Sequence, residues 1–464
     1  MQSRRDQVQA QSYMLGRLTA ALVMAEPEAL ENPHRRILTG MVAGLLIGGL
    51  IMGGFVVFGI LKPGGANQWQ QPETLIVEKE TGGRFVLLDG QLRPVYNYTS
   101  AALIFGKRPA LVTVSAASLK SVSRGMPIGI VGAPDAPPDP AGLADLEWSV
   151  CALAGTDQTG ATQTGTLLIL TRGGGATPVE DNSGFTVTAP GGRVFLIWNG
   201  QRFALTQPWI PRVLGYAAAA PPVSADWLNQ LPPGPDITPL DVVGRGEAGP
   251  VVDGRPATVG QVFVVRVVGV PDRYFLLLRD GLSPIGATAV ALVLGDPDTG
   301  KAYAGSPVRP VELTAGGLAQ LPVSRQQPLP AGLPQQPPAQ AVLPVNQTWC
   351  IRRSTPDGPA VVTMQATPTV TVAGDSQNIS RTEQTATAVL AAPGVGGLVR
   401  QGRAGQAGGT SYFLVTDAGV KFPIGTADAA KALGYSLEQS RTVPAALLSL
   451  LPTGPVLDLI PATR

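Results

Sequence analysis

"YFLVTDAGVKFPIGTADAAKALGY", residues 412–435, is the stretch that organises the chain. It begins with the aromatic and β-branched residues typical of a strand, turns at Ala418 and Gly419, and continues into a second short strand. A helical pattern follows and ends at Gly434. These features predict a β-hairpin followed by a short helix, a unit too small to bury much surface alone.

The same unit recurs at three earlier places in the chain. In every copy the turn glycine and the helix-ending glycine are 14 to 16 residues apart. The pairs are Gly90 with Gly106, Gly200 with Gly215, Gly281 with Gly295, and Gly419 with Gly434. We expect four repeats, at residues 72–132, 191–248, 255–325 and 398–464. They are expected to pack on a shared support or on one another; four independent linked modules are the alternative.

Three of the copies continue alike. About 20 residues after the helix-ending glycine, a leucine-containing segment ends in a glycine close to a proline. These glycines are Gly125, Gly234 and Gly454, whereas the third copy reads "GLAQLPVS" without the glycine.

The composition favours a β-rich, turn-rich protein without a nucleic-acid surface. Charged residues make up 14% of the 464 residues, and the chain holds 57 glycines and 44 prolines. A net charge of +2 and 5% aromatic residues give no support for nucleic-acid binding. A single histidine, His34, and two cysteines leave little of the usual catalytic side-chain chemistry.

Residues 37–61, "ILTGMVAGLLIGGLIMGGFVVFGIL", carry no charge and are long enough to span a bilayer. They predict one transmembrane helix. A cleaved signal peptide is the competing interpretation, but 36 residues precede this run and no A-x-A site follows it.

The charges beside this run predict its orientation. Five arginines, Arg4, Arg5, Arg17, Arg35 and Arg36, precede it, whereas only Lys62 and Lys79 occur in the next stretch. By the positive-inside rule the N-terminus is expected in the cytoplasm and the C-terminal region outside the membrane, in the periplasm.

Residues 1–36 predict a cytoplasmic amphipathic helix. Its apolar stripe consists of Val8, Leu15, Leu18 and Leu22. Because so short a segment cannot bury that stripe alone, it is expected to dock on a partner or on the membrane surface.

A central β-rich domain is predicted from two distant halves, residues 146–190 and 345–390. Each half places a tryptophan just before a cysteine, Trp148 with Cys151 and Trp349 with Cys350. The proline-rich residues 326–344 form an extended linker before the second half. On the oxidising side of a membrane the two cysteines are expected to form a disulfide, two buried free thiols being the alternative.

The sequence offers no complete catalytic motif. Residues 295–302, "GDPDTGKA", fit G-x-x-x-x-G-K but place Ala302 where a nucleotide-binding loop needs serine or threonine. We therefore expect no catalytic residues, no metal and no cofactor. A wall-binding module that grips glycans with Trp198, Trp209 and Trp227 is a further alternative, although tryptophans in such positions are more often core.

Several stretches resemble the EccB family, the single-span membrane subunits of type VII (ESX) secretion systems. They are "RRDQVQAQSYMLGRL", "DGQLRPVYNYTSAALIFG", "RGMPIGIVGAPDAP", "WSVC" and "VPAALLSLLPTGPVL". The resemblance implies a periplasmic region of four repeats around a disulfide-closed central domain. It also implies assembly with EccC, EccD and EccE, with a mycosin protease nearby, into an oligomeric inner-membrane complex.

The predicted protein is thus α+β, with a cytoplasmic helix, one transmembrane helix, and four hairpin-helix repeats around a central β-rich domain. The predicted function is that of a non-catalytic assembly subunit that contacts the lipid bilayer, its own copies and the other ESX subunits. A peptidoglycan-binding module and a nucleotide-hydrolysing (ATPase) subunit are the alternatives.

Overall fold

The computed structural model describes residues 4–24, 33–61, 68–140, 146–156, 162–173, 175–217, 219–355, 358–368, 378–402, 409 and 411–461. Pro27 and Lys62, which the sequence places just after the two N-terminal helices, lie outside these residues, and the side chains of Arg35 and Arg36 are likewise not described. The described chain is mixed α+β, as predicted, and divides into two units.

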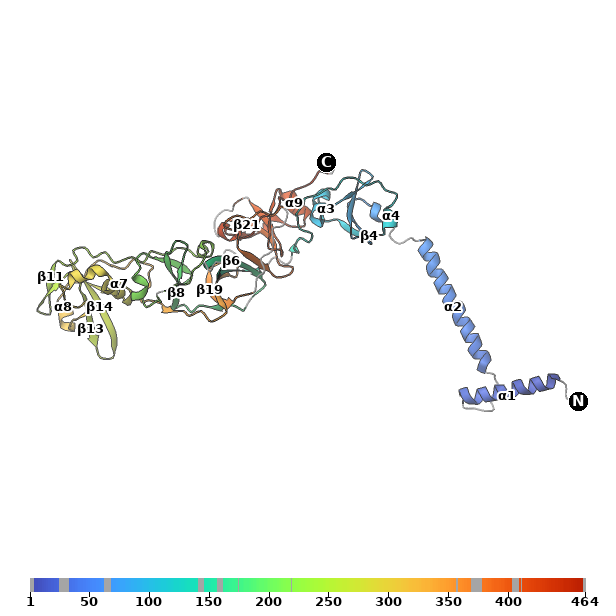
Figure 1. Ribbon diagram of the computed structural model, residues 1–464, viewed down its shortest axis with the longest axis horizontal. Coiled ribbons are helices and arrows are strands. Elements are labelled where there is room, and N and C mark those ends of the chain that lie inside the picture. The colour runs from blue at the N-terminus through green and yellow to red at the C-terminus, as the bar shows by residue number, and fades with distance from the viewer. Residues whose placement is uncertain are drawn as a thin grey trace. The chain divides into compact units, whose positions relative to one another are not determined.

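The first unit comprises residues 1–90 and 110–123. It contains α1 (Arg4–Met24), α2 (Pro33–Leu61), η1 (Gln68–Gln70), β1 (Thr74–Glu78), β2 (Arg84–Leu88), β4 (Ala110–Val114) and α4 (Ala116–Leu119). β1 pairs antiparallel with β2 and parallel with β4. Figure 1 labels α1 and α2 at the N-terminal end of the chain.

Helix α2 contains the apolar run noted in the sequence. Within the described residues, Leu38–Phe58 is the one segment long and apolar enough to cross a membrane, with a mean hydropathy of 2.3. None of its residues is buried against the rest of the protein. An apolar helix of this length without a protein partner is the expected form of a membrane span.

The second unit, residues 91–109 and 124–464, is built on a central sheet. In the described residues its strand order is β20-β6-β5-β18-β19-β7. The bounds are β5 (Glu147–Thr156), β6 (Thr162–Thr171), β7 (Thr177–Pro178), β18 (Gln347–Arg353), β19 (Val361–Ala366) and β20 (Ala388–Ala391). β5 and β18 pair antiparallel in the middle, so strands from residues 147–178 and 347–391 form one sheet.

Three smaller sheets that follow in the second unit share one topology among the residues described. Their orders are β10-β9-β8-β17, β15-β14-β13-β16 and β23-β22-β21-β24. In each, three strands form antiparallel pairs and a fourth joins in parallel. We call the chain around these sheets the second module (183–240), the third module (262–326) and the fourth module (397–461).

The bounds in the three modules follow the chain. The second module has β8 (Ser183–Thr188), β9 (Val194–Trp198), β10 (Gln201–Leu205), α5 (Ile210–Val213) and α6 (Ala225–Leu228). The third has β13 (Val262–Val267), β14 (Val270–Leu278), β15 (Gly281–Ile285), α7 (Ala287–Gly295), η3 (Pro297–Ala302), β16 (Val311–Glu312) and α8 (Ala315–Ala319). The fourth has β21 (Gly397–Gln401), β22 (Tyr412–Val415), β23 (Lys421–Ile424), α9 (Ala427–Ala432), η4 (Leu437–Gln439), β24 (Arg441–Val443) and α10 (Ala445–Leu448).

Four further elements of the described second unit belong neither to the central sheet nor to the three modules and their sheets. β3 (Gln91–Pro94) and α3 (Tyr98–Phe105) belong to the second unit and precede the central sheet in the chain. β11 (Ala248–Val252) and β12 (Arg255–Thr258) form a hairpin before the third module.

Two strands of the second sheet differ from the ranges expected from sequence. β8 lies within residues 146–190, yet it pairs with β9 and so begins the second module. β17 (Ala339–Gln340) comes from the proline-rich linker at 326–344 and pairs in parallel with β8. An extended segment without its own partner can add to an open sheet edge, which the linker's composition alone does not predict.

Local sequence signals account for the turns and helix starts. At the β9–β10 turn both Asn199 (φ 48°) and Gly200 (φ 66°) are left-handed, as a tight two-residue hairpin requires. The side chain of Thr426 accepts a hydrogen bond from the Ala429 N–H and caps α9, and Gly434 (φ 84°) follows that helix. The third module differs because Gly295 is the last residue of α7 itself.

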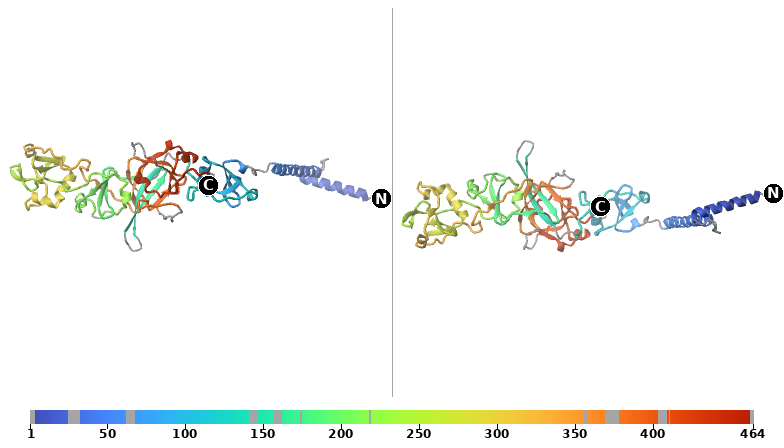
Figure 2. Two further views of the ribbon diagram at one scale, coloured as in Figure 1. Left: turned by 90° about the horizontal axis from the view of Figure 1, so that it is seen from above. Right: turned by 90° about the horizontal axis from the view of Figure 1, so that it is seen from below.

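The modules share their cores with their neighbours in the second unit. One cluster joins the central sheet to the second and fourth modules, including Trp148, Trp227 and Leu447. A second cluster joins the second and third modules, including Phe203 and Leu292. A third joins α3 to the fourth module. In Figures 1 and 2 the second module lies between the third module and the central sheet, as these shared clusters require.

Candidate functional site

The centre of the second unit is the pair of strands β5 and β18. Their register places Cys151 directly opposite Cys350. The two residues form a disulfide, with Cα atoms 4.0 Å apart, and both are fully buried with Leu167 and Ala388. A covalent link at this position joins the two halves of the central sheet across a sequence separation of 199.

The tryptophans beside the cysteines pack in the shared core. Trp148 is 1% exposed and Trp349 is 4% exposed. The Trp349 ring stacks on Phe185 of the second module, with ring centres 3.7 Å apart. The central sheet is therefore the support against which the second and fourth modules pack.

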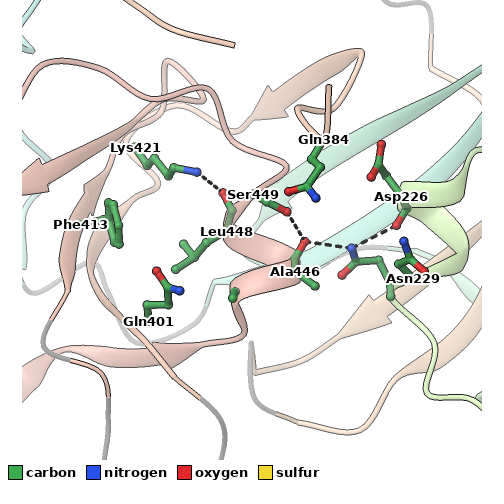
Figure 3. A pocket seen from close by; sticks show the side chains of 11 residues that line it. Asp226, Asn229, Gln384, Gln401, Phe413, Lys421, Ala446, Leu448 and Ser449 are labelled. Atoms are coloured by element: carbon green, nitrogen blue, oxygen red, sulfur yellow. Dashed lines mark hydrogen bonds between the residues drawn. The ribbon is translucent and has the colours of Figure 1, made fainter. Parts of the chain in front are cut away.

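A cavity of about 440 Å³ lies beside this support, between the second and fourth modules. Figure 3 shows Lys421 and Phe413 of the fourth module on one side and Asp226 and Asn229 of the second on the other. Its walls also include Gln230, Gln384, Gln401, Ala445, Ala446, Leu448 and Ser449.

Lys421 is held at the edge of this cavity by the end of a helix. Its ammonium donates a hydrogen bond to the carbonyl of Leu448, the last residue of α10. The ammonium also lies 5.9 Å from the centre of the Phe413 ring. Burial lowers the pKa of Lys421 to about 8, because an ammonium loses solvation in a partly enclosed site. Burial likewise raises the pKa of Asp226 on the other side.

The apolar stripe predicted on α1 is exposed in the isolated chain. Val8 is 67% exposed, Leu22 is 82% exposed, and Leu15 and Leu18 are each 59% exposed. Large apolar side chains in a row on a solvated helix form a surface that another molecule or a bilayer can cover.

Comparison with known proteins identifies the family. The family profile described as "Type VII secretion system ESX-1, transport TM domain B", that of EccB, matches residues 1–463. The chain belongs to the EccB family. The family predicted from the sequence is thereby confirmed.

Curated relatives of the EccB family match along almost the whole chain. The "ESX-3 secretion system ATPase EccB3" of Mycolicibacterium smegmatis is 27% identical over 478 residues, covering 98% of this chain and 89% of the relative. The "ESX-1 secretion system ATPase EccB1" of Mycobacterium tuberculosis strain H37Rv is 26% identical over 462 residues, covering 97% and 92%.

Solved structures with a similar fold come from ESX secretion complexes. An EccB3 dimer from the ESX-3 core complex aligns with a TM-score of 0.60 at 25% identity, covering 83% of this chain and 98% of that one. A chain of the periplasmic assembly from the ESX-5 inner membrane complex aligns with a TM-score of 0.64 at 24% identity, covering 86% and 96%.

The relatives' names contain the word ATPase, and residues 295–302 are the stretch of this chain that partly fits a nucleotide-binding motif. These residues end α7 and form the short helix η3, so no strand leads into the loop and no long helix follows it. The Lys301 ammonium lies 2.6 Å from the Asp298 carboxylate, and both side chains are exposed. A phosphate-binding loop needs backbone N–H groups at a helix N-terminus around the phosphates, which this geometry does not supply.

The same loop has a structural partner instead. The Asp296 carboxylate accepts a 2.7 Å hydrogen bond from the guanidinium of Arg245, and both side chains are nearly buried. Arg245 also donates to the Thr299 hydroxyl at 2.8 Å. This ion pair fixes the loop onto the chain just after the second module.

The tryptophans considered for glycan binding do not form an exposed platform. Trp227 is fully buried in the core beside the central sheet. Trp198 and Trp209 are half-buried and pack against the core shared by the second and third modules. The Trp198 indole N–H donates to the carbonyl of Asp181.

Two cations escaped the sequence analysis. Arg202 and Lys421 both stand two residues after a hairpin turn glycine, in β10 and β23. Arg202 donates to the carbonyl of Leu228, the last residue of α6, as Lys421 does to Leu448. Their equal offset from Gly200 and Gly419 is a signal that aligning the copies would have revealed.

Proposed function

We propose that this chain is a non-catalytic structural subunit of a type VII (ESX) secretion inner-membrane complex. The observation that carries the proposal is the match of the EccB profile to residues 1–463. The solved relative described as a dimer of EccB3 from the ESX-3 core complex supports a role in assembly.

In this proposal α2 anchors the chain with its N-terminus in the cytoplasm. The arginines before the apolar run, including Arg4, Arg5 and Arg17, support that orientation. Helix α1 then docks through Val8, Leu15, Leu18 and Leu22 on a cytoplasmic subunit of the EccC, EccD or EccE type. The exposure of all four side chains supports this role.

The region after the span is proposed to be a periplasmic scaffold of four repeats around the central sheet. Its support is the matching topology of the small sheets and the cores that they share with their neighbours. The Cys151–Cys350 disulfide is proposed to close this scaffold in the oxidising periplasm. A β-rich body linked in this way presents fixed surfaces to other copies of the chain and to a mycosin protease.

The proposal is tested on the full chain in its own membrane. A tagged copy is extracted in mild detergent, and the mass and composition of the purified complex are measured. We expect an untagged second copy and an EccC-type subunit to copurify. Recovery of a lone monomer under conditions that preserve other membrane complexes contradicts the proposal.

The docking role of α1 has its own test. Leu15→Glu with Leu18→Glu should reduce recovery of the cytoplasmic subunits several-fold while the second copy is retained. Gln9→Glu, on the opposite side of α1, is the matched control and should leave the complex unchanged. Equal recovery with both variants rules out docking through the stripe.

A further inference from the structure

The cavity between the second and fourth modules contains polar groups that the fold leaves without partners. Gln230 is 5% exposed, and its amide nitrogen donates to the carbonyls of Asp226 and Ala446. Both of its N–H donors are thereby used, and its side-chain oxygen has no donor among the described residues. That oxygen can therefore accept a hydrogen bond from a molecule bound in the cavity.

Further amides line the same space. Gln384 and Gln401 are cavity-lining side chains that make no hydrogen bond within the described protein. Asn229 uses its oxygen to accept from Arg202 at 2.7 Å, which leaves its N–H donors. The cavity thus offers both donors and acceptors, the pattern that a peptide main chain complements.

Two opposite charges lie on different sides of the cavity. Figure 3 shows Lys421 on one side and Asp226 on the other, with Gln384 between them and Gln401 below Phe413 on the Lys421 side. In the described part of the chain, Lys421 and Asp226 do not form an ion pair with each other. Lys421 donates to Leu448 alone, whereas its counterpart Arg202 donates to both Leu228 and Asn229. The ammonium therefore keeps N–H donors for a further acceptor.

We propose that this cavity binds the C-terminal end of a short peptide segment, with its carboxylate on Lys421 and its main-chain amides on Gln230, Gln384 and Gln401. The Asp226 carboxylate repels a carboxylate from the opposite end and so sets the direction of the peptide. Charge-assisted hydrogen bonds and main-chain amide contacts are recurring means of recognising peptide termini. A volume of about 440 Å³ is within the range of small-ligand sites.

A neutral sugar matches the cavity less well. A neutral sugar would leave the charges of Lys421 and Asp226 without an ionic partner. The Phe413 ring, on which the sugar could stack, already faces the Lys421 ammonium. The peptide site is independent of the scaffold role and goes beyond it.

The test uses the full chain in detergent and measures binding of tri-alanine by calorimetry, with tri-alanine C-terminal amide as the comparison. We expect the carboxylate form to bind at least about tenfold more tightly, the effect of one charge-assisted hydrogen bond. Lys421→Met should remove this preference, and Gln401→Ala should weaken binding of both peptides. The Gln401 side chain makes no hydrogen bond within the described protein, so its variant keeps the proposal testable if Lys421→Met fails to fold.

Three results would overturn the proposal. They are no binding of tri-alanine, equal affinity for the two peptides, or binding that Gln401→Ala leaves unchanged. Binding of an N-acetylated disaccharide in place of tri-alanine would also overturn it and assign the cavity to a glycan. Loss of function in the scaffold test above leaves these outcomes unaffected, so the two proposals fail separately.

Discussion

The second and fourth modules differ from the third at one position of a shared backbone arrangement. In all three, a segment after the short helix runs parallel to the last hairpin strand. The N–H groups of Gly234, Ser324 and Gly454 donate to the carbonyls of Arg202, Leu282 and Lys421 in turn. The residue after each acceptor is a phenylalanine in two modules and a serine in the third.

Among these three modules the glycine and the ring occur together. A Cβ atom on Gly234 would lie 2.2 Å from the Phe203 ring, and one on Gly454 would lie 2.3 Å from the Phe422 ring. In the third module Ser283 replaces the ring and Ser324 replaces the glycine. Ser283 donates to the carbonyl of Gln326 at 2.8 Å, and Ser324 donates to Asp280 at 2.7 Å. The third module replaces ring packing by hydrogen bonds at this position.

The residue before the phenylalanine or serine also differs between the modules. Arg202 and Lys421 donate to the last carbonyl of a short helix, whereas Leu282 is buried in an apolar cluster within the third module. A cation at a helix C-terminus satisfies an open carbonyl and the helix dipole. The two modules that pack on the central sheet therefore carry half-buried cations, and the third carries a small core of its own.

Breaking the disulfide should have the largest effect on stability, and the effect should differ between the modules. Cys151→Ser should lower the free energy of unfolding by about 2–5 kcal/mol, since a loop of this length is no longer closed in the unfolded chain. Hydrogen exchange should rise first in β5, β18 and the core that they share with the second and fourth modules. The core of the third module, around Phe263 and Leu277, should respond least.

Non-reducing electrophoresis provides the control for this prediction. The oxidised full chain should migrate differently from the reduced chain, and Cys151→Ser should remove that difference. Identical migration of both forms would mean that the cysteines are not joined. Uniform exchange across all modules would remove the distinction between them.

A methyl group at the ring-facing glycine should be the next most damaging change. Gly234→Ala should cost about 1–3 kcal/mol, because the Cβ atom overlaps the Phe203 ring in a packed core. Adding Phe203→Ser should lower stability further, because it empties part of a packed core, but by less than Phe203→Ser does alone, since the clash with the Gly234→Ala methyl group is then absent. The measurement is chemical unfolding of the full chain.

Gly300→Ala in the third module is the matched control. Nothing lies within 4 Å of a Cβ atom at that position, so its effect should stay within about 0.5 kcal/mol. If Gly234→Ala is equally mild, the ring does not require glycine, and the proposed difference between the modules does not hold.

The buried cation of the fourth module should give a smaller, pH-dependent effect. Lys421 should titrate at about pH 8 in the folded chain, below its usual 10.5. Between these values the unfolded chain binds more protons, so stability should rise with pH. Because the side chain is partly exposed, we expect on the order of 1 kcal/mol after allowing for solvent screening.

Carbon-13 NMR of the lysine side chains measures this titration, and Lys421→Met identifies the signal. The rise in stability across this pH window should be smaller in that variant. A Lys421 signal that titrates with the exposed lysines would show that the cation is not buried at the helix end.

The smallest effect is expected in the third module at Lys301. Lys301→Ala should leave both the free energy of unfolding and the rate of ATP hydrolysis by the purified chain unchanged, because the side chain is exposed and contacts only Asp298 in the described protein. Hydrolysis above the detergent background that this variant abolishes would establish an enzyme and contradict the non-catalytic proposal.

Much of the local architecture could be predicted from the sequence because its signals are local. The apolar run within α2, the Asn199–Gly200 turn and the glycine after α9 each act over a few residues. The strand boundary at Ser183 and the strand β17 could not be placed in this way. Both depend on which sheet edge is available, and that is decided by chain far away.

The candidate cavity lay further beyond sequence reasoning. Asp226, Gln384 and Lys421 are distant in the chain, and none belongs to a recognisable motif. Their proximity follows from the packing of α6 and α10 beside one sheet, which Gln230 links through the Ala446 carbonyl. Polar residues on separate elements carry no periodic signal from which such a meeting can be inferred.

The sequence by itself determined that this protein has one apolar span, recurring hairpin and helix units, and two cysteines in distant β-rich halves. The tertiary structure decided that those halves share one sheet, that a ring requires glycine in two modules but not in a third, and that two opposed charges line one cavity. The reason is physical: hydrophobic periodicity and turn chemistry are properties of neighbouring residues, whereas close packing and unpaired polar groups arise only when distant segments meet.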